Sequence, residues 1–201
     1  MIVFKHLFLL YFFASSFAHG QAYPHKPIRL VTSEPGGGSD FAARLIAQGL
    51  TTIIGQRVVV DNRGFVAGDI VARAAPDGYT LILYGSPLWL APFLRKNVPF
   101  DPVKDFAPVS LVVNTPNVLV VHPAAGVKSV AELIALAKAR TGELNYSSAS
   151  TGSTQHLGAE LFKSMAGVNI VRVPYKGSGP ALTAVIASQV QLMIPSAGSA
   201  S

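Results

Sequence analysis

The glycine-rich turn at residues 35–40, with the sequence PGGGSD, is the stretch whose residue types most clearly predict chemistry. It lies between an apolar run at residues 28–31 and an amphipathic segment that begins at Phe41. A strand, a glycine turn and a helix in this order leave the first N–H groups of the helix free to bind an anion. Glycine lets the backbone approach a ligand closely, and Ser39 or Asp40 can cap the helix. The alternative is an ordinary glycine loop followed by an N-cap.

A second small-residue turn, at residues 148–154, offers serine hydroxyls beside a histidine. Ser150 and Ser153 precede His156, which begins a predicted helix. A serine hydrolase would need a base within reach of a hydroxyl and an acid behind that base. The Gly177-Ser178-Gly179 stretch lacks the Gly-x-Ser-x-Gly frame, and His156 has no evident acid partner. A serine-dependent hydrolase or transferase therefore stays an alternative, and it predicts that Ser153 and His156 are adjacent.

Other catalytic and cofactor chemistries receive less support from the sequence. The glycine turn lacks the spacing of a P-loop or of a dinucleotide fingerprint. Lys176 lies between Tyr175 and Gly177 in a predicted turn, which favours a solvated or ligand-facing cation over a Schiff-base nucleophile. The five histidines form no metal-ligand cluster and the chain has no cysteine, so we expect neither a metal nor a cofactor. Trp89 and Phe93 can cover a cleft, or they can pack a short helix against the core.

The elements that must position these turns are predicted to form two α/β lobes, at residues 23–104 and 105–201. In the first lobe, apolar spacing predicts strands at residues 28–31, 58–60 and 79–84 and helices at residues 41–54, 67–75 and 87–96. A right-handed crossover would make the first two strands parallel. The C-terminal ends of parallel strands line the ligand crevice of an open α/β sheet.

The second lobe repeats this order after a proline-rich passage near residues 100–108. Its predicted elements are strands at residues 109–113, 118–121, 144–147, 169–173 and 190–194 and helices at residues 130–140, 155–165 and 180–187. Each lobe then has a small-residue turn between a strand and a helix. We expect residues 31–41 and 148–156 to face each other across one cleft, with helix N-termini on both walls.

The N-terminus has the residue order of a secretory signal peptide. Lys5 and His6 precede an unbroken apolar stretch at residues 7–13, and small residues follow through Ala22. The apolar stretch is well short of the about 20 residues that a spanning helix needs, which disfavours a membrane anchor. We therefore expect residues 1–22 to be a signal peptide, and an exported chain without cysteine suits a bacterial periplasm.

The net charge constrains the class of partner. The formal net charge is +6, and the basic residues are scattered singly along the chain. A nucleic-acid surface would gather them in a stripe with aromatic residues between them, so we expect no nucleic-acid partner. The same charge is compatible with a small anionic ligand.

Seven motifs follow one another in fixed order along the chain. They are YPHKPIRLV (residues 23–31), PGGGSD (35–40), PDGYTL (76–81), DPVKDFAPV (101–109), LNYSS (144–148), GSTQHL (152–157) and VPYKG (173–177). Together they resemble the Bug family, the extracytoplasmic solute receptors of tripartite tricarboxylate transporters, over residues 23–196. The resemblance implies an α/β, two-lobed periplasmic binding protein-like (type II) fold. It also implies a monomeric, non-enzymatic receptor that closes on a small solute, commonly a carboxylate, and presents it to membrane permease subunits.

The resemblance also places the ligand site. In that family the ligand's carboxylate is held mainly by backbone N–H groups and water at the first turn, and the other end of the ligand meets turns from both lobes. Carried over position by position, the ligand-binding residues are Pro35, Gly36, Gly37, Gly38, Ser39, Asp40, Gly85, Ser86, Ser150, Gly152, Ser153, Thr154, His156 and Lys176.

Three departures from the family pattern affect this transfer. Glu34 stands where the family often has proline, and its carboxylate should repel an anionic ligand or bind an amino group. Residues 87–89 replace more polar residues after the third strand, which leaves the identity of the ligand open. Family members return to the first lobe with further strands and a helix, which this sequence lacks. We therefore expect a chain truncated at its C-terminus, and a truncated product that binds nothing is the remaining alternative.

Overall fold

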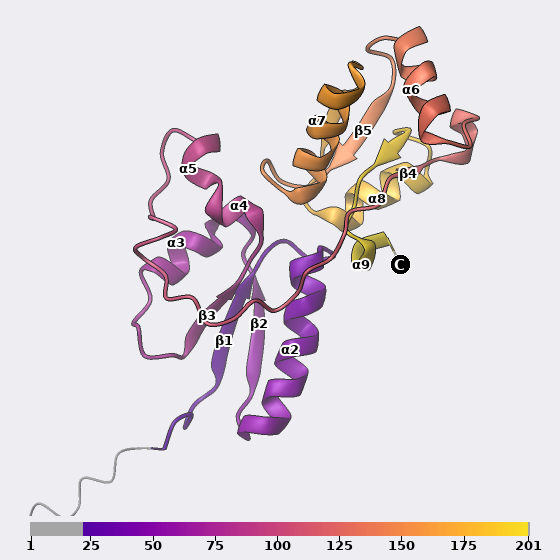
Figure 1. Ribbon diagram of the computed structural model, residues 1–201. Coiled ribbons are helices and arrows are strands. Elements are labelled where there is room, and N and C mark those ends of the chain that lie inside the picture. Colours follow the sequence, from indigo (N-terminus) through magenta and orange to yellow (C-terminus); the bar gives the residue numbers. More distant parts are fainter. Residues whose placement is uncertain (1–21, 201) are drawn as a thin grey trace, which may run out of the picture.

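A computed structural model of the protein describes residues 22–200, in which one extended stretch of chain joins two α/β lobes and α9, the last described element, lies at their junction (Figure 1). Residues 1–21 of the predicted signal peptide lie outside the described residues. We call the part from β1 to α5 the first lobe and the part from β4 to α9 the second lobe. The boundary between residues 104 and 105 stays a prediction. Within residues 22–200, no helix combines the length and the apolar character that crossing a membrane requires.

The first lobe is built on a three-stranded parallel sheet with the order β2-β1-β3. Its elements are β1 (Ile28–Thr32), α2 (Gly38–Ile54), β2 (Val58–Asn62), η2 (Gly64–Val66), α3 (Ala67–Ala72), β3 (Thr80–Leu83), α4 (Ser86–Trp89) and α5 (Ala91–Leu94). The predicted parallel pairing of the first two strands is confirmed, with Ile28 opposite Val58. Helix α2 packs against β1 and β2, and α3 packs against β1 and β3. Apolar side chains of α2 and β1 meet in a core that includes Leu30, Ala43 and Ala47.

The second lobe has a four-stranded sheet with the order β4-β7-β5-β6. Its elements are β4 (Val120–Val121), η3 (Pro123–Ala125), α6 (Val130–Ala139), β5 (Asn145–Ser148), α7 (Thr154–Ala166), β6 (Val171–Pro174), α8 (Ser178–Ile186), β7 (Leu192–Met193) and α9 (Ala197–Ala200). Strands β5, β6 and β7 are parallel, and β4 runs antiparallel to β7. The predicted strands at residues 118–121 and 190–194 are thus shorter than expected.

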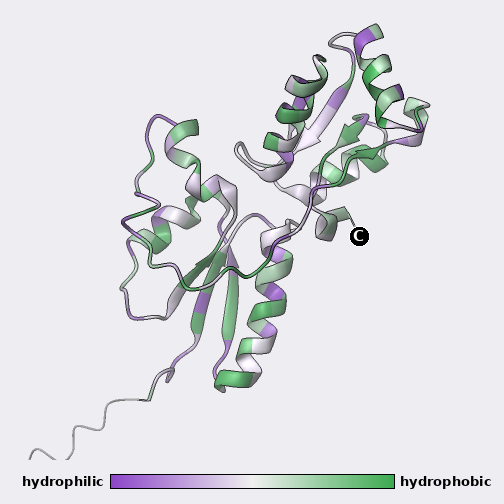
Figure 2. Ribbon diagram, in the orientation of Figure 1, coloured by the Kyte–Doolittle hydropathy of each residue, from purple (hydrophilic) through white to green (hydrophobic). Residues whose placement is uncertain are grey.

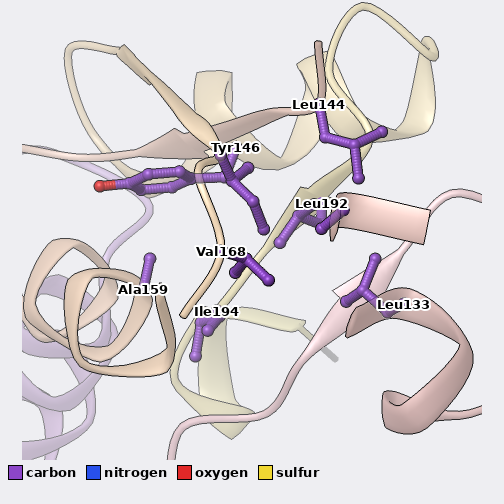
Figure 3. Close-up of a cluster of buried hydrophobic side chains, with 9 residues drawn as sticks. Leu133, Leu144, Tyr146, Ala159, Val168, Leu192 and Ile194 are labelled. Atoms are coloured by element: carbon purple, nitrogen blue, oxygen red, sulfur yellow. The ribbon is translucent and has the colours of Figure 1, made fainter. Parts of the chain in front are cut away.

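Helices cover both faces of this second sheet. Successive side chains of a strand point to opposite faces, and β7 shows the pattern. Leu192 packs in a cluster with Leu133 of α6 and Ala159 of α7 (Figure 3). Met193 packs instead with Ala181 of α8. Burial of this apolar surface holds the helices whose first residues form the candidate site.

Residues 107–117 form an extended passage between the lobes rather than the strand predicted at residues 109–113. Val109 and Leu111 are 86% and 84% exposed, and Figure 2 colours much of this passage as hydrophobic. A strand needs a neighbour to satisfy its backbone groups, and none of the described strands lies beside this run. The prediction of a strand there is wrong for this reason.

The passage between the lobes pairs with the chain that leaves β7. The N–H of Val118 donates to the carbonyl of Pro195 at 2.8 Å, and the N–H of Ala197 donates to the carbonyl of Pro116 at 3.0 Å. Helix α9 then lies against α2, so the chain after β7 does reach the first lobe. Two paired segments at a lobe junction are the kind of connection that permits hinge motion.

Candidate functional site

The first turn, residues 33–38, joins β1 to α2 in a way that differs from the predicted capping. Gly37 is the N-cap of α2 and no side chain caps the helix, so the expectation that Ser39 or Asp40 does so is wrong. Asp40 lies inside the first helical turn, and its carboxylate accepts the N–H of Gly36 at 3.0 Å. Gly36 has φ +79°, a left-handed conformation that a side chain would strain. A side chain inside the first turn of α2 therefore stabilises the preceding loop.

The Asp40 carboxylate is buried and holds the turn in place. Asn62 Nδ2 donates to one of its oxygens at 2.8 Å and to the carbonyl of Ser33 at 2.7 Å, and Arg44 lies 3.0 Å from the same carboxylate oxygen. Burial alone would raise the pKa of Asp40, but the hydrogen bonds from Gly36, Asn62 and Arg44 lower it below its ordinary value. Asp40 is thus a charged anchor whose two oxygens already have partners.

Three backbone donors of this turn stay available. Among the described residues, no hydrogen bond uses the N–H of Gly37, Gly38 or Ser39. They lie at the N-terminus of α2, a helix of 17 residues. Free N–H groups and the helix dipole together favour an anion at this end.

The second turn follows β5 and is held by one arginine. The Arg172 guanidinium donates to Ser148 Oγ at 2.8 Å, to Thr151 Oγ1 at 3.1 Å and to the carbonyl of Ala149 at 3.0 Å. Three bonds in a fixed planar fork fix the shape of the turn. Arg172 is a residue that the sequence analysis did not assign to the site.

His156 and Ser153 also serve the second turn rather than each other. The hydroxyl of Ser153 accepts the backbone N–H of His156 at 3.3 Å and so caps α7. His156 Nδ1 accepts the N–H of Gly152 at 3.2 Å. Burial, and then the positive charge of Arg172, lowers the pKa of His156 below its ordinary value. No hydrogen bond among the described residues joins the Ser153 hydroxyl to the imidazole, so the geometry that a hydrolase requires is not formed.

The third turn, residues 175–179, brings the start of α8 to the second turn. Gln155 Nε2 donates to Ser178 Oγ at 2.5 Å, while Gln155 Oε1 accepts the N–H of Ala149 at 3.2 Å. Both Gln155 and Ser178 are buried. The first residues of α7 and α8 are therefore tied together, and the N–H groups of Ser178 and Gly179 have no partner among the described residues.

The first turn lies against this tied pair, and Figure 1 shows the start of α2 at the lobe junction. A Cβ added at Gly37 would lie 3.5 Å from Ser178 Oγ, and one added at Gly36 would lie 3.2 Å from the backbone nitrogen of Gly179. The N-termini of α2, α7 and α8 thus converge around Ser178. We call this arrangement the helix junction.

A further contact between the lobes comes from the turn after β3. Ser86 Oγ donates to the carbonyl of Gly152 at 2.9 Å. A Cβ added at Gly85 would lie 3.7 Å from Ser39 Oγ, and one added at Gly152 would lie 2.5 Å from a methyl group of Leu94. Gly85 and Ser86 therefore lie between the first and second turns.

The remaining predicted residues occupy the edge of this region or its surroundings. Pro35, Thr154 and Lys176 are exposed, and Ser150 is half-buried. Trp89 and Phe93, for which the sequence left cover and core open, are 48% and 84% exposed, so neither is a core residue here.

Gln155 and Ser178 were not among the predicted site residues, and two other residues near the junction also escaped the sequence analysis. Ser196 is buried, and its Oγ would lie 3.0 Å from a Cβ added at Gly38. Asn62 holds Asp40, as described above. Ser196 and Asn62 come from chain segments far from the first turn in sequence. The only signal for them in the sequence is a polar residue at the end of a strand.

Neither a metal-ligand group nor the hollow along β1 and β2 involves the predicted ligand-binding residues among the described residues. Within residues 22–200, no group of three or more histidine, aspartate or glutamate side chains is placed to hold a metal ion. A shallow hollow lies along β1 and β2, where Asp61 pairs with Arg29 and Arg63. Both guanidinium groups pair with this one carboxylate, which leaves the hollow a net charge of +1. None of the predicted ligand-binding residues lines this hollow.

Comparisons with known proteins point to one class. Residues 42–201 match the family model described as the tripartite tricarboxylate transporter family receptor. Protein BugT of Bordetella pertussis is 41% identical over 182 residues, which are 85% of this chain and 56% of that protein. A protein of Pseudomonas sp. (strain P51) from the tcbD-tcbE intergenic region is 37% identical over 180 residues, 87% of this chain and 54% of that protein. The chain thus spans about half the length of these relatives.

Solved structures agree with this match. An R. palustris protein determined with adipate superimposes with a TM-score of 0.83 at 41% identity, covering 87% of this chain and 60% of that one. MatC from Rhodopseudomonas palustris with bound malate gives a TM-score of 0.77 at 31% identity, covering 87% of this chain and 61% of that one. Both similarities extend over both lobes.

Proposed function

Because this chain belongs to the tripartite tricarboxylate transporter receptor family, we propose that it is a solute-binding receptor that binds a small carboxylate by lobe closure and delivers it to membrane permease subunits. Proteins of this family are periplasmic receptors that bind small carboxylate ligands. Adipate and malate are the ligands of two similar structures. We propose the same class of ligand, and no enzymatic activity, for this chain.

The observation that carries the proposal is the helix junction. Each helix N-terminus is equivalent to about half a positive charge, and three of them converge around Ser178. The free N–H groups at Gly37, Gly38 and Gly179 can hold a carboxylate without a lysine or arginine. The proposed ligand-binding residues stay those of the four turns, with Asp40 as the anchor of the first turn.

Closure follows from the connection between the lobes. The passage that joins the lobes pairs near Val118 with the chain that leaves β7 near Pro195. A carboxylate that contacts the first turn and the start of α8 at once would favour the closed arrangement, since it binds that arrangement more tightly. We propose that residues 1–22 direct export and that the receptor acts as a monomer.

Calorimetric titration tests this function. The purified chain should be titrated with di- and tricarboxylates, amino acids and aromatic acids. We expect saturable binding of at least one carboxylate and none of its neutral diamide. Absence of binding of every compound to the folded chain would refute the receptor proposal.

A further inference from the structure

The side chain of Ser86 donates a hydrogen bond from the first lobe to the second. Its Oγ lies 2.9 Å from the carbonyl oxygen of Gly152. Among the described residues, no other hydrogen bond and no ion pair joins the part from β1 to α5 with the part from β4 to α9. Both partners belong to the chain itself, so the bond needs no solute to bridge the lobes.

Leu94 packs against the same glycine from the first lobe. A Cβ added at Gly152 would lie 2.5 Å from Leu94 Cδ1 and 3.7 Å from the Cα of Pro87. A leucine methyl group therefore occupies space that a side chain at position 152 would fill. Gly152 is buried at this place. We call the contact of Ser86, Pro87 and Leu94 with this residue the Gly152 contact.

The second lobe holds Gly152 in a fixed orientation. Its N–H donates to Nδ1 of His156 in α7 at 3.2 Å, and the N–H of Ser153 donates to the carbonyl of Ser150 at 3.0 Å. Gly152 has φ +85°, a left-handed conformation that glycine adopts without strain. The turn therefore presents the Gly152 carbonyl as a fixed acceptor to the first lobe.

The first lobe holds the other side of the contact equally well. Ser86 is the first residue of α4, and Leu94 is the last residue of α5. Leu88 of α4 and Ala91 of α5 are buried in one apolar cluster with Phe100. In Figure 1, α4 and α5 lie on the side of the first lobe that faces α7. The two sides of the Gly152 contact thus belong to the packed bodies of different lobes.

We propose that the Gly152 contact is a latch that holds the two lobes in the closed arrangement before a solute binds, and that Ser86 is a positioning residue for this closure. The latch is separate from the paired segments near Val118, which permit the hinge motion. Its consequence for solute binding rests on the proposed function. A receptor binds with an apparent affinity reduced by the fraction of molecules in the binding-competent arrangement, and the latch raises that fraction.

The distance between the lobes tests the latch without any solute. The chain has no cysteine, so Lys96→Cys and Ser164→Cys introduce two unique sites for spin labels, both at exposed positions and one in each lobe. Double electron–electron resonance should show mainly a short distance in this labelled chain. Ser86→Ala and Leu94→Ala should each lower the ratio of short to long distances about twofold to tenfold, as expected for one neutral hydrogen bond or a few buried methyl contacts.

Two controls separate the latch from a general loss of structure. Thr52→Ala removes a hydroxyl that bonds only to Gln48 within α2, at 3.3 Å, and Ile53→Ala removes a side chain that is 80% exposed. Both should leave the distance distribution unchanged. Neither Ser86 nor Leu94 belongs to an apolar core cluster of the first lobe, so their variants should melt at the same midpoint as the controls.

Addition of glutarate distinguishes the latch from a direct solute contact. Glutarate should return Ser86→Ala to the short distance, with an affinity lowered by no more than the change in the distance ratio. An unchanged distance distribution in both variants would overturn the latch, and weaker glutarate binding by Ser86→Ala with unchanged distances would overturn it in favour of a solute contact. Altered distances in both variants, with no carboxylate bound by the original chain, would support the latch and refute the receptor proposal.

Discussion

Removal of the Asp40 carboxylate should destabilise the protein far more than removal of a surface carboxylate. Asp40 is 5% exposed, and its oxygens accept from Gly36 at 3.0 Å and from Asn62 at 2.8 Å. A hydrogen bond to a charged group contributes about 1.5–3 kcal/mol, whereas the pair with the exposed Arg44 adds less than about 1 kcal/mol. We therefore expect Asp40→Ala to lower the free energy of unfolding by about 3 kcal/mol.

Urea denaturation followed by circular dichroism measures this loss, with Asp69→Ala as the control. Asp69 pairs with Arg73 on the surface of α3 at helical spacing, so its removal should cost no more than about 0.5 kcal/mol. Asp40→Asn should cause an intermediate loss of stability. Its side chain keeps an oxygen that can accept the N–H of Gly36, but its amide group faces the amide of Asn62. Equal destabilisation by Asp40→Ala and Asp69→Ala would refute the role of Asp40 as the anchor of the first turn.

The same carboxylate gives the loss a pH dependence. The folded-state pKa of Asp40 is lowered from its ordinary value of about 3.9. A lowered pKa contributes stability that is fully present above the unfolded value and is lost as pH falls through the folded value. The difference in free energy of unfolding between the original chain and Asp40→Ala should therefore be constant, at about its full value, from pH 5 to 7. It should become smaller below about pH 4.

Three other predictions concern the junction and the passage between the lobes. Gly36→Ala and Gly55→Ala should each lower the free energy of unfolding by about 1–2 kcal/mol, because both glycines have a left-handed backbone. Only Gly36→Ala should weaken carboxylate binding, since Gly55 has open space around it. Equal affinities of the two variants in calorimetry would contradict this. Titration of the His156 imidazole by NMR should give a pKa below about 6.5. Carboxylate binding should weaken as pH falls through that pKa, because a protonated Nδ1 cannot accept the N–H of Gly152. A His156 pKa above 6.5 would contradict this. Leu111→Ser should reduce self-association and the binding of a dye that reports exposed apolar surface, without loss of stability, because Leu111 is 84% exposed. A lower unfolding midpoint of this variant would show that Leu111 is packed.

Local pattern was sufficient to predict most of the first lobe's order of elements, although the single helix expected at residues 87–96 is two short helices, α4 and α5. The apolar run before the glycine turn and the helical spacing after it correspond to β1 and α2, and the parallel pairing with β2 is confirmed. Both features depend on neighbours in sequence, which the pattern records. The family resemblance, which rests on seven ordered motifs, is also confirmed by the matches over both lobes.

Long-range contacts explain what the sequence did not predict. Asp40 was expected as a cap because of its residue type, but its partner Asn62 comes from the end of β2. The bond between Gln155 and Ser178 joins the starts of two helices through residues that are 23 positions apart. The strand expected at residues 109–113 fails for the same reason, because strand formation depends on a partner that the local sequence does not specify.

Mapping of backbone amides by NMR tests the helix junction most directly. The 15N-labelled chain should be titrated with glutarate and with 4-aminobutyrate. The account predicts saturable shifts at the amides of Gly37, Gly38, Ser39, Ser178 and Gly179, which have no partner among the described residues. Saturable binding with these five amides unmoved, and shifts confined to other turns, would contradict it.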